Sequence, residues 1–320
     1  MDTRFIHSLF LTIALAFGAA RAEAQQWTTN NLPVGLVAWW RAEGNLLDSV
    51  STNHLQADGG VTFSSGRFGQ AFQFDGVSAS AYCPGDAPAF NDWTQFTMEA
   101  WINLDATNDL PNTGGRAIVS RVGNSANHTL NFGYQFGIYD NSQRIFCQFN
   151  TNGQTWPGVQ TTAPFPRPLV TGVWYHVAAT YDHNAVELFF NGVPLTTNNV
   201  GPATLLHSPS TFRISKDDNG NVPFAGRIDD VRIYNRGLSE VEIAYLYTGR
   251  PWLALTRTNA QLTVSWTPPD VGWVLEWTNV LPQVSAPWLQ ILPPYQTNGA
   301  KLEFLELAPA ANKFYRLHQQ

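Results

Sequence analysis

Residues 174–194 read WYHVAATYDHNAVELFFNGVP, and this stretch carries the clearest strand pattern in the chain. Apolar side chains fall on every second position of its first half, at Tyr175, Val177, Ala179 and Tyr181. After the polar turn at 182–184 they do so again, at Val186, Leu188 and Phe190. Because successive side chains of a strand point to opposite faces, the pattern predicts a β-hairpin, and Asn191-Gly192 predicts a second tight turn.

Similar short segments fill the chain from residue 36 onward, separated by clusters of Gly, Asn, Asp and Pro, with no long helical period before residue 238. In residues 96–104, FTMEAWINL, the even positions are apolar, and the opposite face carries Thr97, Glu99, Trp101 and Asn103. One helix is predicted, because Ser239 and Glu242 form a capping box and Gly249 follows as a stop signal. Consecutive antiparallel strands of this kind indicate an all-β sandwich or jelly roll rather than a parallel α/β sheet.

The length of 320 residues suggests two domains, and the composition changes near residue 250. Beyond Arg250-Pro251 the chain has short strand patterns around Pro-rich turns, such as LTVSW at 262–266. We therefore expect a lead-in at 25–34, a large β domain at 35–249 and a small β module at 250–320.

The N-terminus has the pattern of a secretory signal peptide over residues 1–24. Arg4 supplies the positive charge, residues 9–17 form the apolar segment, and Ala22-Glu23-Ala24 fits a cleavage site. No later segment approaches the ~18 apolar residues that a membrane span requires, and no Cys follows the cleavage site to carry a lipid. The sequence therefore predicts a secreted or extracytoplasmic protein, in the periplasm or at the cell surface, with no membrane span in the mature chain.

Composition narrows the class of partner. Charged residues make up 13% of the chain, against about 25% in an ordinary globular domain, whereas Trp, Phe and Tyr are abundant. The net charge is -6, and the mature chain has no basic block that could release counterions from a phosphate backbone. Nucleic-acid binding is therefore excluded.

Four blocks in order carry a resemblance to a known family: GLVAWWRAEGN at 35–45, GQAFQFDG at 69–76, WYHVAATYD at 174–182 and GRIDDVRIYNR at 226–236. Together they resemble the laminin-G-like jelly roll of the concanavalin A-like lectin/glucanase superfamily. The resemblance implies a two-sheet antiparallel sandwich that acts as a binding or adhesion module, with ligand or calcium sites on rim loops or on one sheet face. Residues 250–320 are more loosely similar to a short fibronectin-type or immunoglobulin-like module.

No catalytic residues are predicted. Laminarinase-type hydrolases of the related fold carry E-x-D-x-x-E on one strand, and this chain lacks that motif. Its closest acidic pair, Glu240 and Glu242, falls in the first turn of the predicted helix, where it complements the helix dipole. The chain also lacks G-x-S-x-G and H-E-x-x-H. His176 would join Glu99 and Trp101 if their strands are neighbours, or else pack as an ordinary strand histidine.

Calcium is the one metal worth testing, because it binds hard oxygen ligands and such oxygens recur in the predicted loops. The candidate ligands are Glu43, Asp48, Asp75 and Asp229, with Asn45 and Asp230 beside them. The alternative is that these acids accept hydrogen bonds from turn amides. The acidic stretch 216–221 offers the same two alternatives.

Two cysteines, Cys83 and Cys147, form either a single disulfide, as an exported protein allows, or two buried thiols. A carbohydrate site would need exposed aromatic rings, for which Trp156 is the loop candidate and Trp101 the sheet-face candidate. The leading hypothesis is a non-catalytic module that binds a glycan or an extracellular or surface protein. The alternatives are a structural or adhesion component of a surface assembly, and a glycoside hydrolase.

Overall fold

The computed structural model describes residues 34–85, 87–106, 115–124, 131–139, 143–151, 158–205, 208, 210–218, 222–249, 253–259, 261–266, 273–279, 288–298, 301–307 and 313–319. Residues 1–24, where the signal peptide is predicted, lie outside this part of the chain. Among the described residues, no helix is long and apolar enough to cross a membrane.

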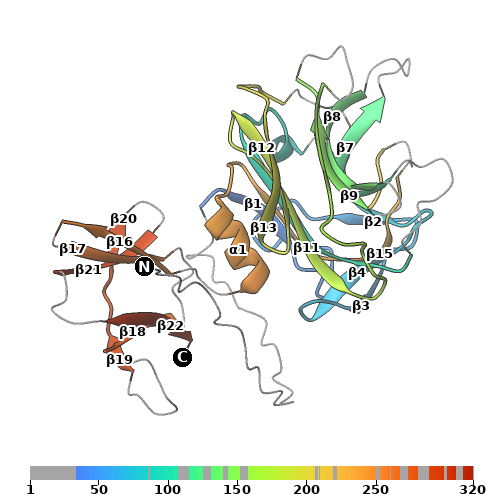
Figure 1. Ribbon diagram of the computed structural model, residues 1–320. Helices are drawn as coiled ribbons and strands as arrows, with labels where there is room; N and C mark the ends of the chain where they lie inside the picture. The colour runs from blue at the N-terminus through green and yellow to red at the C-terminus, as the bar shows by residue number, and fades with distance from the viewer. Residues whose placement is uncertain are drawn as a thin grey trace, which may run out of the picture.

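Two large antiparallel sheets form the first part of the protein (Figure 1). Sheet A contains, in spatial order, β13 (Val193–Asn199), β12 (Ala185–Phe190), β11 (Trp174–Tyr181), β6 (Phe96–Leu104), β15 (Ala225–Tyr234), β4 (Gln70–Asp75) and β3 (Thr62–Ser65), with β1 (Leu36–Trp40) paired to β15. Sheet B contains β10 (Val159–Pro164), β9 (Arg144–Phe149), β8 (Asn131–Tyr139), β7 (Arg116–Asn124), β14 (Phe212–Ile214), β5 (Ser80–Cys83) and β2 (Gln56–Asp58). A 3-10 turn, η1 (Pro88–Phe90), follows β5.

The predicted hairpin is confirmed as β11 and β12, which pair in antiparallel register. At the turn, the Asp182 carboxylate accepts hydrogen bonds from the amides of Asn184 (2.9 Å) and Ala185 (2.7 Å). Asn191 and Gly192 both have positive φ, at 50° and 76°, as a two-residue hairpin loop with right-handed strand twist requires. Local sequence therefore determines three consecutive strands of sheet A.

The inner faces of the two sheets bury one apolar core. All five even-numbered side chains of β6 belong to it and have no exposed surface: Phe96, Met98, Ala100, Ile102 and Leu104. Trp40 stacks on Phe212 (5.2 Å), which in turn stacks on Phe90 (4.5 Å). Burial of each such side chain contributes about 1.5–3 kcal/mol, so these contacts hold the two sheets together.

The helix predicted after residue 238 is confirmed as α1 (Glu240–Thr248), with Ser239 as its N-cap, a complete capping box with Glu242, and Gly249 in the left-handed conformation. It lies on the outer face of sheet A (Figure 1), where Leu238 and Ile243 form a second apolar cluster with strand side chains. As a result, β6 is buried on both of its faces.

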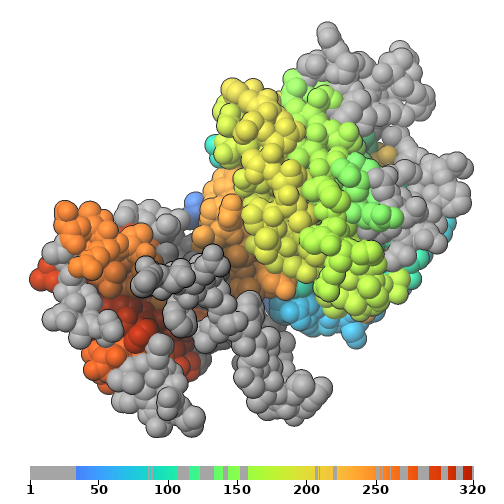
Figure 2. All heavy atoms as spheres, in the orientation of Figure 1, coloured from blue at the N-terminus to red at the C-terminus, as the bar shows by residue number. Residues whose placement is uncertain are grey.

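The two edge strands β10 and β13 lie side by side (Figure 2) and close one side of the sandwich. Asn198 on β13 donates a hydrogen bond from Nδ2 to Thr161 Oγ1 on β10 (3.0 Å). This contact joins sheet A to sheet B beside the strands that carry the candidate site described below.

Residues beyond 252 form two small antiparallel sheets. Sheet C contains β16 (Leu253–Thr258), β17 (Gln261–Trp266), β21 (Lys301–Leu307) and β20 (Gln296–Asn298), and sheet D contains β19 (Leu289–Ile291), β18 (Trp273–Thr278) and β22 (Phe314–Gln319). They bury a core of their own around Val264, Trp266 and Leu275, and the Trp266 ring contacts Tyr295 edge-on at 4.7 Å. The C-terminal part is therefore a small β module with a separate core.

The disulfide alternative is wrong, because Cys83 and Cys147 are free, buried thiols. Cys83 lies on β5 and Cys147 on β9, which are four strands apart in sheet B. Neighbouring strands are about 4.8 Å apart, so the two residues are separated by roughly 19 Å, whereas a disulfide needs Cα atoms within about 7 Å. Burial raises the pKa of both thiols, which keeps them protonated and unreactive.

Candidate functional site

One side chain from each strand of sheet B lies in a single row across the sheet. Strand registers place in this polar row Gln160, Gln148, Gln135, Ser120, Arg213, Tyr82 and Gln56. Residues adjacent to them in sequence, such as Cys147 and Phe136, point into the core. Because side chains alternate along a strand, the polar row lies on the outer face of sheet B.

The three glutamines of the polar row form a hydrogen-bonded ladder. Gln160 Nε2 donates to Gln148 Oε1 (3.0 Å), and Gln148 Nε2 donates to Gln135 Oε1 (2.9 Å). Each amide is therefore held in one orientation by the next, and within the described residues the ladder ends in an unused donor at Gln135 and an unused acceptor at Gln160.

The ladder forms part of a groove of about 340 Å³. Its lining residues are Gly115, Gln135, Tyr139, Phe146, Gln148, Gln160 and Val222. The Tyr139 and Phe146 rings lie 5.4 Å apart at an angle of 53°. Between Gln135 and Tyr139 on β8, Gly137 is required, because a Cβ there would come within 2.2 Å of the Arg116 carbonyl oxygen. The backbone of β7 therefore approaches β8 closely beside the groove.

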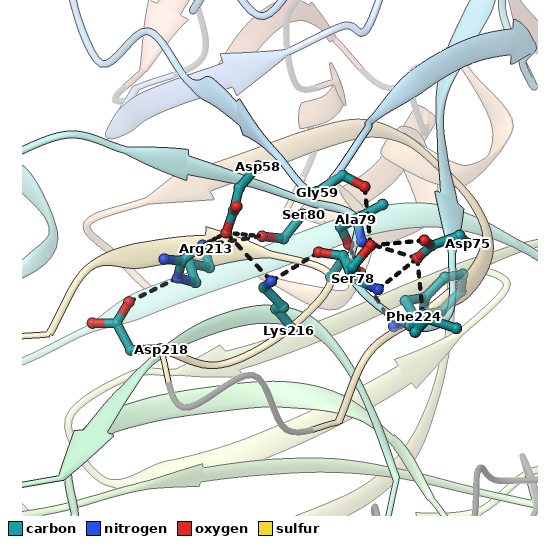
Figure 3. A network of polar contacts seen from close by, with 12 residues as sticks. Asp58, Gly59, Asp75, Ser78, Ala79, Ser80, Arg213, Lys216, Asp218 and Phe224 are labelled. Atoms are coloured by element: carbon teal, nitrogen blue, oxygen red, sulfur yellow. Dashed lines mark hydrogen bonds and ion pairs between the residues drawn. The ribbon is translucent and has the colours of Figure 1, made fainter.

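The other end of the polar row is satisfied internally (Figure 3). Arg213 lies over the Tyr82 ring (5.1 Å) and forms ion pairs with Asp218 (2.7 Å) and Asp58 (2.9 Å). Lys216 Nζ lies 2.8 Å from the Ser78 carbonyl oxygen and 3.3 Å from Asp58. Burial raises the pKa of Asp58, but hydrogen bonds and charge attraction from Lys216 and Arg213 lower it by a larger amount. The pKa of Asp58 is therefore below its ordinary value. The groove end is therefore the part of the row with polar atoms available to a ligand.

Comparison with known proteins identifies the family. A laminin G-type family, described as the concanavalin A-like lectin/glucanases superfamily, matches residues 75–244. The chain belongs to this superfamily. The resemblance found in the sequence and the predicted jelly-roll fold are both confirmed.

The individual proteins that this chain resembles share little sequence identity with it. It is 23% identical over 154 residues to adhesion G-protein coupled receptor V1 of Danio rerio, a match that covers 48% of this chain and 2% of the receptor. Domain 4 of AbnA, an extracellular arabinanase from Geobacillus stearothermophilus solved with arabinotriose, has a TM-score of 0.51 at 17% identity, covering 68% of this chain and all of that one. The binding domain of Paraclostridial Mosquitocidal Protein 1 has a TM-score of 0.52 at 16% identity, covering 85% and 66%. These two likenesses show the fold alone.

The four acids proposed for calcium are not brought together. Among the described residues, no group of three or more His, Cys, Asp or Glu side chains is placed to hold a metal. Each acid instead accepts hydrogen bonds from backbone amides: Glu43 from Gln70, Asp48 from Trp39 and Val50, Asp75 from Val77, Ser78 and Ala79, and Asp229 from Arg67 and Phe68. This arrangement corresponds to the turn-amide alternative, and calcium binding stays a prediction.

Two of these acids have shifted pKa values for opposite reasons. Partial burial raises the pKa of Asp75, but three backbone amides and the Ser78 hydroxyl lower it to about 2. For Asp229, burial and the neighbouring Asp230 carboxylate raise the pKa to about 8. Its Oδ1 atom is buried and has no hydrogen-bond partner, so the neutral form is favoured.

Trp101 is wrong as a sugar platform, because its side chain is only 2% exposed. The Tyr247 ring of α1 stacks on it (5.6 Å, 28°), and the Arg67 guanidinium lies 4.7 Å from its ring. Trp101 is on the outer face of sheet A, but α1 packs over it. The alternating pattern of β6 could not show that a helix from a distant part of the sequence packs on this face. Trp156 lies outside the described residues.

His176 does join Glu99 and Trp101, since β11 and β6 are neighbours and His176 is opposite Trp101. His176 Nε2 lies 3.0 Å from Glu99 Oε2, and Arg232 Nη1 donates to Glu99 Oε1 (2.7 Å). Burial raises the pKa of Glu99, but Arg232 and His176 together lower it by a larger amount. The pKa of Glu99 is therefore below its ordinary value. Glu99 and His176 have no exposed surface and Arg232 is 8% exposed, so this enclosed group joins strands.

The glutamine ladder was missed at the sequence level. Gln135, Gln148 and Gln160 are 12 or 13 residues apart, and Gln148 lies directly between the core residues Cys147 and Phe149. The sequence did contain one indication of the ladder: a glutamine recurs every 12 or 13 residues, the distance between equivalent positions of consecutive antiparallel strands, on the face opposite the core.

Proposed function

We propose that this protein is a secreted, non-catalytic module that binds a glycan in the groove on the outer face of sheet B. The observation that carries the proposal is the oriented ladder of Gln135, Gln148 and Gln160 beside the Tyr139 and Phe146 rings.

The chemistry of the groove suits a sugar. Sugar hydroxyls both donate and accept hydrogen bonds, as do side-chain amides. The C–H faces of a sugar ring pack on aromatic rings, and Tyr139 is the partly exposed ring of the groove, with the buried Phe146 ring beside it. Because each amide is already held by its neighbour, a ligand would immobilise few side chains on binding, which lowers the entropic cost of association. The groove is also built on strands, which hold its residues more rigidly than loops do.

A hydrolytic role has less support. A retaining glycosidase needs two carboxyl groups about 5 Å apart beside the ligand. The described lining of the groove contains no Asp or Glu. The enclosed carboxylate of Glu99 lies on the outer face of the other sheet.

Secretion is supported by the signal-peptide pattern of residues 1–24. Glycan binding is in keeping with the arabinanase domain, which was solved in complex with arabinotriose. Binding or adhesion roles are also indicated in the names of the receptor and of the mosquitocidal protein domain.

The test is a glycan array on the mature protein, followed by calorimetry on the glycans that bind. Gln148→Ala breaks the ladder at its centre, and Tyr139→Ala removes the partly exposed ring of the groove. Each is expected to weaken glycan binding by about tenfold, or about 1.4 kcal/mol. Gln70→Ala, an exposed glutamine on β4 in sheet A, is the matched control and is expected to bind normally.

Thermal melts of each variant show whether the fold is retained. Glycan binding that is unchanged in both groove variants would overturn the groove as the site. Capture of a protein partner by a chain that binds no glycan would favour the alternative of an adhesion component.

A further inference from the structure

Val222 bounds one side of the groove on sheet B. The groove crosses four neighbouring strands, from Gln160 on β10 to Val222 beside β7. The Val222 carbonyl oxygen accepts a hydrogen bond from the Ala117 amide of β7 (2.8 Å), and Ala117 is paired with Gly137 on β8. Val222 therefore lies across the groove from the Gln160 end of the glutamine ladder.

The backbone of Val222 is strained. Its φ is 52°, in the left-handed region, where a β-branched residue is a genuine outlier. Among the described residues, it is the one β-branched residue with a positive φ. Val222 also precedes Pro223, and the proline ring further restricts the conformation of the residue before it. Two local preferences of the chain are therefore opposed at a residue that lines the groove.

The surrounding fold imposes this backbone conformation. On one side, the Val222 carbonyl is bound by the Ala117 amide. On the other side, Phe224 is fully buried in the core, and its amide donates to Ser215 Oγ (3.2 Å). A glycine would adopt the same conformation without strain. The fold therefore requires the backbone at position 222 but does not require a valine side chain there.

The Val222 side chain has its open contact in the groove. It is partly exposed, and it belongs to none of the three apolar clusters of the described residues. Strained residues concentrate at ligand sites, where the cost of the strain is offset by a role in binding. The strain and the position of Val222 both indicate that its isopropyl group acts on a ligand.

Resting on the proposed function, we propose that Val222 determines the specificity of the groove by closing its β7 side, so that the ligand is a linear glycan. The C–H groups of an unbranched chain can pack against the isopropyl group. A sugar branch at this position would overlap with it, and the hydrogen bond to Ala117 prevents the backbone from moving aside.

The test compares linear polymers with their branched counterparts: mannan with galactomannan, and debranched arabinan with arabinan. Calorimetry on the mature protein should show that the linear polymer of at least one pair binds about tenfold more tightly than the branched one, as expected for a small apolar wall. Val222→Gly should reduce this preference to about one, and Val222→Ala should give an intermediate preference.

Thermal melts of the same variants separate a role in binding from a role in folding. Val222→Gly should raise the melting temperature by about 2 °C, because the strain released exceeds the entropy that glycine adds to the unfolded chain. A fall in melting temperature would show that the Val222 side chain serves the fold and would overturn the proposal.

Ala42→Gly is the matched control, because Ala42 also has a positive φ, of 55°, but lies in the loop after β1 of sheet A. Its preference for linear polymers should equal that of the parent protein. An equal loss of preference in this control, an unchanged preference in Val222→Gly, or equal binding of linear and branched polymers by the parent would overturn the role of Val222 and leave the groove intact. If no glycan binds, the proposed function fails and this inference fails with it.

Discussion

The outer faces of sheets A and B carry polar side chains of different kinds. On sheet A, the charged residues Glu99, His176 and Arg232 are enclosed, with α1 lying over the same face. On sheet B, neutral amides line a groove. A buried charge is stable only beside its partners, whereas an amide ladder satisfies itself and still offers donors and acceptors to a ligand. The comparison favours a stabilising role for the outer face of sheet A and supports the proposed binding role for that of sheet B.

The largest expected effect breaks the enclosed group on sheet A. Glu99→Gln removes the negative charge that faces the buried Arg232 and His176, and we expect a loss of about 3 kcal/mol in the free energy of unfolding. Urea denaturation measures it. Gln148→Ala on sheet B is the comparison and is expected to cost less than about 1 kcal/mol while weakening glycan binding. Equal losses of stability in the two variants would remove the distinction between the faces.

A pH-dependent effect sharpens the comparison further. The pKa of Asp229 rises from 3.8 to about 8 in the folded protein, because burial and Asp230 disfavour its ionised form. Its contribution to stability is therefore fully present below about pH 4 and is lost as the pH rises through about 8.

Between pH 5 and pH 9 the parent protein should lose at least about 2 kcal/mol of its free energy of unfolding as Asp229 ionises. Asp229→Asn has no proton to lose at this position and should not show that loss. Thermal melts of both proteins across this range provide the measurement. Parallel pH profiles for the two would show that Asp229 ionises normally in the folded state.

The smallest expected effect concerns calcium. Since Glu43, Asp48, Asp75 and Asp229 already accept backbone hydrogen bonds, we expect the melting temperature to differ by less than about 1 °C between millimolar calcium and excess chelator. A ligand bound only to the folded state would raise stability in proportion to ln(1 + [L]/Kd). A rise of several degrees with calcium would therefore restore a metal site at the rim of the sandwich.

Much of the fold could be predicted because its signals are local. The alternation in β11 and β12, the Asn191-Gly192 turn and the Ser239 capping box each depend on residues a few positions apart. The site was less predictable. Trp101 and Gln148 both lie on outward-facing strand positions, yet Trp101 lies beneath Tyr247 and Gln148 lines a groove. No pattern within either strand distinguishes them.

The sequence by itself determined the β11–β12 hairpin and its turns, strand β6, helix α1 and the family, because these depend on short-range side-chain periodicity and backbone preferences. Only the tertiary structure decided that Cys83 and Cys147 lie four strands apart, that Glu99 meets His176 and Arg232, and that three glutamines align across β8, β9 and β10. The physical reason is that strand order, register and the placement of α1 arise from packing between distant segments. Those same features decide which face of a sheet is buried and which can bind a ligand.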